Sequence, residues 1–243
     1  MADGLFRSDH VKRCISELLG TYVLVFVGPS SVILLPKLSL SSTPEGLVLV
    51  ALIFGLTVSA MIMLLGEHSG AVINPALALA ATSARLLKKE LLVPYILFQT
   101  VGGILAGLTL GLVFHPLGDS TNLGSTKLAA NISPIAGIAL EAIGTFILAT
   151  SALAATSWIR RTEFQALMVG GTLTILIILI GPLTGAGFNP ARSFGPALSS
   201  DYFSSFYVYV IGPVVGAMIA GVLFRWILGS RDHQWSIAKQ STL

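Results

Sequence analysis

The fold is decided by residues 69–76, Ser-Gly-Ala-Val-Ile-Asn-Pro-Ala, and by residues 184–191, Thr-Gly-Ala-Gly-Phe-Asn-Pro-Ala. Both stretches run from small residues into an Asn-Pro pair. Asn is favoured just before the first turn of a helix, and Pro is favoured at the first helical position. We therefore expect one helix to begin at Asn74-Pro75-Ala76 and another at Asn189-Pro190-Ala191.

Composition places the whole chain in a membrane. Of its 243 residues, 54% are hydrophobic and 10% are charged, and the mean hydropathy is +0.86. A soluble domain carries about 25% charged residues, so a soluble enzyme, a disordered protein and a disulfide-stapled secreted module are excluded. Cys14 is the single cysteine, which excludes an intrachain disulfide and a multi-cysteine metal site. We interpret it as a packing residue.

Six apolar stretches are long enough to cross the hydrocarbon, which takes about 20 residues. They cover residues 14–36, 46–65, 91–114, 134–158, 164–180 and 206–228. The segments at the two Asn-Pro pairs, residues 74–84 and 189–198, reach about 15 Å as helices, which is half a bilayer. The first apolar stretch exceeds the roughly 7–15 apolar residues of a signal peptide, so we expect no cleavage. The sequence predicts an all-α membrane protein with a single domain over residues 1–243.

The basic residues indicate how the spans are oriented, because cytoplasmic flanks are rich in Lys and Arg. Lys37 and Lys127 lie in outer loops if both termini are cytoplasmic, and Arg192 falls inside the second short segment. The other eleven of the fourteen basic residues then lie on the cytoplasmic side: Arg7, Lys12, Arg13, Arg85, Lys88, Lys89, Arg160, Arg161, Arg225, Arg231 and Lys239. We interpret the net charge of +3 as this topology signal and not as a surface for nucleic acid.

The two halves of the chain resemble each other. Glu17-Leu-Leu-Gly-Thr-Tyr22 matches Glu141-Ala-Ile-Gly-Thr-Phe146, and residues 95–107 match residues 209–221. With the Asn-Pro segments, three blocks in register indicate a duplication over about residues 12–115 and 134–229. Each copy holds three spans, so the second copy is inverted in the membrane. Inverted repeats with short interrupted segments predict a site at the bilayer midplane, where we expect the two Asn-Pro starts to meet.

Such a site favours a neutral hydrogen-bond acceptor. The Oδ1 atom of Asn74 or Asn189 can cap its own helix, which leaves the NH₂ group free to donate into a lumen. Two helix N-termini, each worth roughly half a positive charge, converge there and disfavour cations. Arg192 lies one turn into the second short helix, and an arginine at membrane depth costs about 2.5–3.5 kcal/mol. We interpret it as a lumen group that repels cations; the alternative is a structural ion pair.

Glu17 and Glu141 lie at matching positions inside apolar helices. We interpret both as structural carboxyl groups that accept hydrogen bonds from the irregular backbone of their own half; the alternative is a proton relay. No histidines or carboxylates have metal-ligand spacing, no glycine-rich phosphate loop is present, and no nucleophile–base pair stands out. The sequence therefore predicts no catalytic residues, no metal and no cofactor.

These residues resemble the major intrinsic proteins, the family of aquaporins and glycerol facilitators. The two Asn-Pro-Ala motifs, the second continuing as Arg192-Ser-Phe-Gly-Pro196, are similar to its two signature loops, and the resemblance covers roughly residues 12–228. It implies a right-handed bundle of six tilted helices with two half-helices. It also implies a homotetramer with one pore per subunit in the lipid bilayer, which we expect to be the plasma membrane.

The resemblance further implies a selectivity filter made of Phe54, Ile177, Ala186 and Arg192. Strict water channels of the family usually carry histidine at the position of Ile177, so this filter is expected to be wider and less polar, as in archaeal and some bacterial members. Ser193 follows the arginine where glycerol facilitators usually carry aspartate. We expect a passive channel for water that also conducts glycerol or other small neutral solutes and excludes ions and protons. The alternatives are a facilitator whose main solute is glycerol, a metalloid or a gas, and a proton-coupled transporter.

Overall fold

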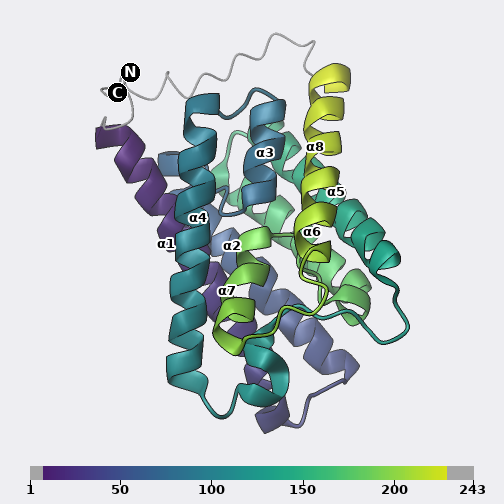
Figure 1. Ribbon diagram of the computed structural model, residues 1–243. Helices are drawn as coiled ribbons and strands as arrows, with labels where there is room; N and C mark the ends of the chain where they lie inside the picture. Colours follow the sequence, from purple (N-terminus) through teal and green to yellow (C-terminus); the bar gives the residue numbers. More distant parts are fainter. Residues whose placement is uncertain (1–7, 229–243) are drawn as a thin grey trace.

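The molecule is a bundle of long helices that run between its two ends (Figure 1). The computed structural model describes residues 8–228. Two short helices, α3 (Pro75–Ser83) and α7 (Pro190–Ser200), and two 3₁₀ segments, η2 (Pro36–Leu38) and η3 (Asp119–Gly124), lie between the long ones. Within the described part of the chain, six helices are long and apolar enough to cross a membrane: α1 (Ser8–Leu34), α2 (Pro44–Ser69), α4 (Lys89–Phe114), α5 (Pro134–Trp158), α6 (Thr162–Thr184) and α8 (Val208–Leu228). The predicted all-α fold of six spans and two short helices is confirmed.

Several helices extend beyond the apolar stretches that predict them. At the helix ends near the site, α2 continues to Ser69 and α6 to Thr184, although their apolar stretches end at residues 65 and 180. Hydropathy marks the part that lies in lipid, whereas a helix continues for as long as its backbone hydrogen bonds are made. In α6 they end at Gly185, which takes a left-handed conformation with φ of 80°. α8 begins at Val208, two residues later than residue 206.

The two short helices begin where the Asn-Pro pairs predict. Oδ1 of Asn74 accepts a hydrogen bond from the backbone N of Ala76 at 2.9 Å, and Oδ1 of Asn189 accepts one from that of Ala191 at 3.0 Å. These bonds satisfy amide groups that have no partner inside the helix. The residues just before each asparagine are irregular, so their backbone groups are free to bond elsewhere.

The same packing contacts recur in both halves of the chain. α1 packs on α4 as α5 packs on α8, while α3 lies against α8 and α7 lies against α4. The backbones come close together: a Cβ atom on Gly107 would lie 2.1 Å from the carbonyl oxygen of Gly195, and one on Gly221 would lie 2.5 Å from that of Ala80. Such close approach between helices is what small residues permit in lipid. Each short helix is thereby held by a long helix of the other half.

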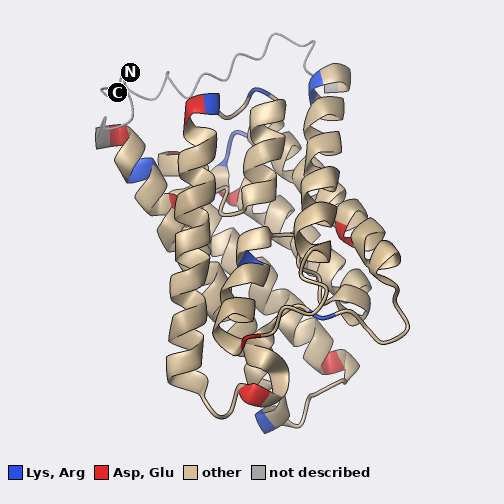
Figure 2. Ribbon diagram, in the orientation of Figure 1, with Lys and Arg blue, Asp and Glu red and all other residues tan. Residues whose placement is uncertain are grey.

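Most of the charged residues lie toward the two ends of the bundle, and a few lie between them (Figure 2). Of the described basic residues, Lys37 lies in η2, Lys127 lies in the connection between η3 and α5, and Arg192 lies in α7. Arg7, Arg231 and Lys239, which the sequence assigns to the cytoplasmic side, lie outside the described residues. The end where α1 begins and α8 ends carries the remaining described ones: Lys12, Arg13, Arg85, Lys88, Lys89, Arg160, Arg161 and Arg225.

Candidate functional site

Asn74 and Asn189 meet in the interior of the bundle. Nδ2 of Asn74 donates a hydrogen bond to the carbonyl oxygen of Phe188 at 2.9 Å, and Nδ2 of Asn189 donates one to that of Ile73, also at 2.9 Å. Each acceptor belongs to the residue just before the other asparagine. Both asparagines are buried, with 3% and 5% of their surface exposed. This reciprocal pair joins the N-termini of the two short helices end to end, as the sequence predicts.

The sequence predicts that the two asparagine NH₂ groups are fully available to the lumen, but each donates one hydrogen bond to the opposite segment. An amide NH₂ carries two hydrogens, and the bond to the opposite segment uses one of them. Both asparagines nevertheless line the central cavity, so each can offer its remaining hydrogen to a molecule inside. Because the cross-segment bonds fix the amide planes, the two donors are oriented before any molecule arrives.

Glu17 holds the irregular segment of the first half. Its carboxyl group accepts hydrogen bonds from the backbone N atoms of Val72 and Ile73 at 3.0 and 2.6 Å. Oγ of Ser69 donates to the same carboxyl group at 2.6 Å, and Nε2 of Gln99 donates to it at 2.7 Å. The side chain is completely buried, so four donors replace the water that this group has lost.

Glu141 plays the matching part in the second half. It accepts hydrogen bonds from the backbone N atoms of Gly187 and Phe188 at 2.9 and 2.7 Å, and from Oγ1 of Thr184 at 2.6 Å. It is also completely buried. The repeat places Pro213 where the first half has Gln99, and proline carries no side-chain donor, so Glu141 has three donors and not four.

Two tyrosines, which the sequence motifs do not mark as site residues, also hold the irregular segments. The hydroxyl group of Tyr95 donates to the carbonyl oxygen of Ser69 at 2.8 Å, and that of Tyr209 donates to the carbonyl oxygen of Thr184 at 2.7 Å. Both tyrosines stand at matching positions in the repeat, and this match is the signal that could have found them. Gln99 has no such match, so the repeat gives no sign of its role.

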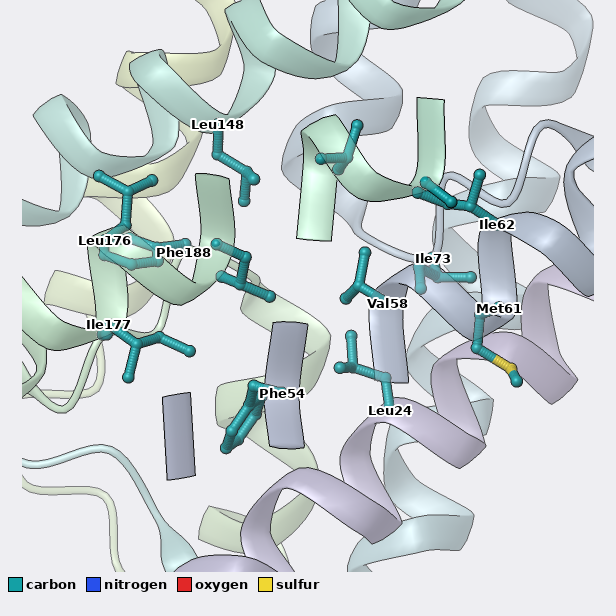
Figure 3. Packing of buried hydrophobic residues seen from close by; sticks show 14 of the residues in the cluster. Leu24, Phe54, Val58, Met61, Ile62, Ile73, Leu148, Leu176, Ile177 and Phe188 are labelled. Atoms are coloured by element: carbon teal, nitrogen blue, oxygen red, sulfur yellow. The ribbon is translucent and has the colours of Figure 1, made fainter. Parts of the chain in front are cut away.

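The two asparagines line a cavity of about 140 Å³ inside the bundle. Its wall is largely apolar and includes Leu24, Val58, Leu148 and Leu173. These side chains belong to the largest buried cluster, in which α1, α2, α5 and α6 turn side chains toward one another (Figure 3). The apolar side chains form no hydrogen bonds with a permeating molecule. The few polar groups of the wall therefore decide where such a molecule is bound.

The four residues of the predicted filter lie together on this cavity. Phe54 comes from α2, Ile177 from α6, Ala186 from the irregular segment and Arg192 from α7, and all four line the wall. The guanidinium carbon of Arg192 lies 4.9 Å from the centre of the Phe54 ring. Nη1 of Arg192 donates to the carbonyl oxygen of Gly124 in η3 at 3.1 Å. A fixed positive charge therefore stands at one end of the cavity.

Arg192 is 4% exposed, and the ion pair considered as its alternative role is not found. The salt bridges formed within residues 8–228 join His115 to Asp119 and Arg161 to Glu163. The guanidinium group of Arg192 is instead stabilised by a carbonyl oxygen and an aromatic face, and because both are uncharged, the side chain keeps its positive charge.

The single cysteine has ordinary surroundings. Cys14 is buried and packs with Leu91 and Tyr95. Among residues 8–228, no group of three or more His, Cys, Asp or Glu side chains is arranged to hold a metal ion.

Comparison with known proteins places this geometry among membrane channels. The family described as Major intrinsic protein matches residues 5–224. Aquaporin NIP1-1 of Zea mays is 38% identical over 234 residues, which make up 96% of this chain and 80% of the relative. Aquaporin AqpM of Methanothermobacter marburgensis is 33% identical over 239 residues, with 89% of this chain and 97% of the relative covered.

A solved structure shares the fold. The X-ray structure of the aquaglyceroporin from Plasmodium falciparum matches with a TM-score of 0.78 and 24% identity, covering 91% of this chain and 97% of that one. At this identity the likeness concerns the arrangement of helices and not the chemistry of the site.

Proposed function

The chain belongs to the major intrinsic protein family, a family of channels and not of enzymes, and from this premise we propose that it is a passive pore for water and for small neutral solutes such as glycerol. The observation that carries the proposal is the reciprocal pair of bonds from Asn74 to Phe188 and from Asn189 to Ile73, beside a cavity that residues of both halves line. It leaves two fixed donors on a largely apolar wall. No chemical step is required, and the solute gradient supplies the driving force.

The same geometry supports the exclusion of protons and cations as part of this proposal. A water molecule beside the two asparagines accepts a hydrogen bond from each amide, which orients it and interrupts proton transfer along a file of waters. The N-termini of α3 and α7 add partial positive charge at this point. Arg192 adds a full charge at one end, so a cation meets two successive barriers.

Solute choice follows from the filter. Phe54 and Ile177 give it two apolar walls, Ala186 keeps the passage open, and Arg192 supplies donors to a hydroxyl or water oxygen. An apolar wall opposite a donor suits a molecule with both carbon and hydroxyl groups. A channel whose main solute is glycerol, a metalloid or a gas is the second candidate, and Ile177 is the residue that favours it.

A proton-coupled transporter receives less support. Such a protein needs a carboxyl group that can exchange a proton with the pathway. Glu17 and Glu141 instead accept three or four hydrogen bonds each from their own halves, and neither lines the cavity. Both are better explained as supports for the irregular segments.

Assembly and orientation belong to the same proposal. We place the chain as one channel domain in a lipid bilayer, in the plasma membrane, with both termini in the cytoplasm, because the basic residues gather at that end of the bundle. A homotetramer with one pore in each subunit is the expected assembly. Water and small neutral solutes are its partners, and nucleic acid is not.

Reconstitution in liposomes tests the function. Vesicles with the full chain are expected to shrink rapidly under an osmotic gradient, with weak temperature dependence and no proton requirement, compared with protein-free vesicles. Glycerol, a metalloid and a dissolved gas are measured in the same preparation to rank the solutes. Uphill accumulation driven by a proton gradient would support the transporter, and shrinkage no faster than that of empty vesicles would refute the channel.

A further inference from the structure

Two adjacent residues of α1, Gly28 and Pro29, stand behind the filter. Both are buried, and neither lines the cavity. Each contacts a different group that holds Arg192: Gly28 lies against the ring of Phe54, and Pro29 lies against Gly124. One turn of a helix that contributes no filter residue thus supports both partners of the filter arginine.

The contact at Gly28 leaves no room for a side chain. A Cβ atom there would lie 2.2 Å from Cε1 and 2.4 Å from Cζ of Phe54, and real carbon atoms do not approach so closely. The ring therefore occupies the space that a methyl group would need. Its position over the guanidinium group of Arg192, 4.9 Å from ring centre to Cζ, depends on Gly28 being glycine.

The contact at Pro29 holds Gly124, whose carbonyl oxygen accepts the hydrogen bond from Arg192. A Cβ atom on Gly124 would lie 2.8 Å from Cβ and 2.9 Å from the carbonyl oxygen of Pro29. Gly124 also has φ of 72°, which other residues adopt only with strain. Leu123, which is 4% exposed and packs with Ile33 of α1, anchors the segment on the same helix.

The second half of the chain provides an internal comparison. The repeat places Val169 where the first half has Phe54, and Ala152 where it has Gly28. Both line the cavity. In the second half, where Val169 replaces the ring, Ala152 replaces the glycine. We therefore infer that glycine is needed at residue 28 because of the Phe54 ring and not because of the helix.

We propose that Gly28 and Pro29 are positioning residues for solute selection: they set where Phe54 and Arg192 stand without touching the permeating molecule. This inference rests on the proposed channel function. An added methyl group at residue 28 pushes the ring away from α1 and into the passage. An added methyl group at residue 124 pushes η3 away from α1, which draws its carbonyl oxygen away from Arg192.

The test measures water permeability, glycerol permeability and proton leak of liposomes, each per amount of incorporated folded protein. Gly28→Ala is expected to lower the ratio of glycerol to water permeability by about threefold or more, the lower range of coupling between residues in contact. Gly124→Ala is expected to raise that ratio and the proton leak. Gly171→Ala is the matched control, because a Cβ atom there meets nothing within 4 Å, and it is expected to behave as the unaltered chain.

Combination with filter variants distinguishes positioning from general damage. In a Phe54→Ala background the ring is absent, so adding Gly28→Ala is expected to change nothing, while Gly124→Ala still shifts the ratio. In an Arg192→Ala background neither variant is expected to change the proton leak further. If Gly28→Ala alone does not fold, the double variant with Phe54→Ala is expected to restore folding, and its failure to do so would overturn the role of the ring.

Each outcome separates this inference from the proposed function. Absence of osmotic shrinkage in the unaltered chain would refute the channel itself. The positioning role alone would be refuted if the unaltered chain conducts and both Gly28→Ala and Gly124→Ala select solutes as the Gly171→Ala control does. Shifts of equal size with and without Phe54 or Arg192 would refute it as well.

Discussion

The two ends of the cavity are built from equivalent positions but differ in chemistry. The repeat can be aligned by Ser69 with Thr184 and by Asn74 with Asn189, which gives the same register. In this alignment each of the four filter residues has an equivalent toward the opposite end, and all eight residues line the cavity. The pairs are Phe54 with Val169, Ile177 with Ile62, Ala186 with Ala71, and Arg192 with Leu77. At these positions one end is therefore aromatic and charged, while the four equivalent residues are all aliphatic.

This difference distinguishes the features that both copies of the repeat share from the features that select the solute. The shared parts, namely the capping asparagines, the buried glutamates and the tyrosines, make the two halves meet at the centre. The charge sits at one end only. A single ring of donors is enough to discriminate between solutes, and a second charged ring would add a barrier for the permeating molecule without adding a new criterion.

The largest expected effect comes from removing a support that both halves share. Glu17→Ala leaves four buried donors without an acceptor, and each unpaired donor costs about 1–3 kcal/mol. We expect loss of most of the folded protein, measured as the yield and thermal unfolding temperature in detergent. Glu141→Ala leaves three donors unpaired and is expected to be less damaging.

Substitution by glutamine is the matched control for both positions. Glu17→Gln and Glu141→Gln keep the shape and one acceptor oxygen, so they are expected to fold better than the alanine variants. Equal stability of Glu17→Ala and the unaltered chain would show that the carboxyl group does not hold the irregular segment.

The next effect in size concerns the charged end. Arg192→Val makes this end as apolar as its counterpart, and we expect glycerol permeability and proton leak to rise by about tenfold or more, since a factor of ten corresponds to only about 1.4 kcal/mol. Leu77→Val, the matched change at the opposite end, is expected to leave the proton leak unchanged. Equal leaks in the two variants would locate charge exclusion at the asparagines and not at Arg192.

The sequence predicts the parts of this site that depend on residue type. The Asn-Pro pairs identify both short helices, and the repeat identifies Glu17 and Glu141 as matched supports. The carbonyl oxygen of Gly124 could not be predicted, because a backbone acceptor exists at every residue and only the path of η3 brings this one to Arg192. Gln99 could not be predicted either, because its repeat partner, Pro213, carries no donor.

The cross-segment bonds of the asparagines show a second limit. Capping of each short helix is a local property, so the sequence indicates it correctly. The bond from Asn74 to the carbonyl oxygen of Phe188 joins residues 114 positions apart, and its formation depends on how closely the two segments approach. Each half by itself leaves its asparagine NH₂ group without a partner. Packing of the two halves then uses one hydrogen of each NH₂ group.

A smaller effect is expected at the filter position that differs from strict water channels. Ile177→His adds a hydrogen-bonding group to an apolar wall and narrows the passage. A change of one small group in a pocket alters selection by about 1–3 kcal/mol, so glycerol permeability is expected to fall several-fold while water permeability falls less. The equivalent change at the opposite end, Ile62→His, is the control. Equal loss of water and glycerol flux in Ile177→His would remove this residue from the filter.

The smallest expected effect tests the difference between the two glutamates. Gln99→Leu removes the fourth donor of Glu17 and so gives the first half the three donors that Glu141 has. It also removes the Oε1 atom of Gln99, which is buried and has no hydrogen-bond partner among residues 8–228. The lost bond destabilises and the lost unpaired oxygen stabilises, each by about 1–3 kcal/mol, so the net change in thermal unfolding is expected to be small. A loss as large as that of Glu17→Ala would mean that three donors do not suffice in the first half, and that the two glutamate sites are not equivalent.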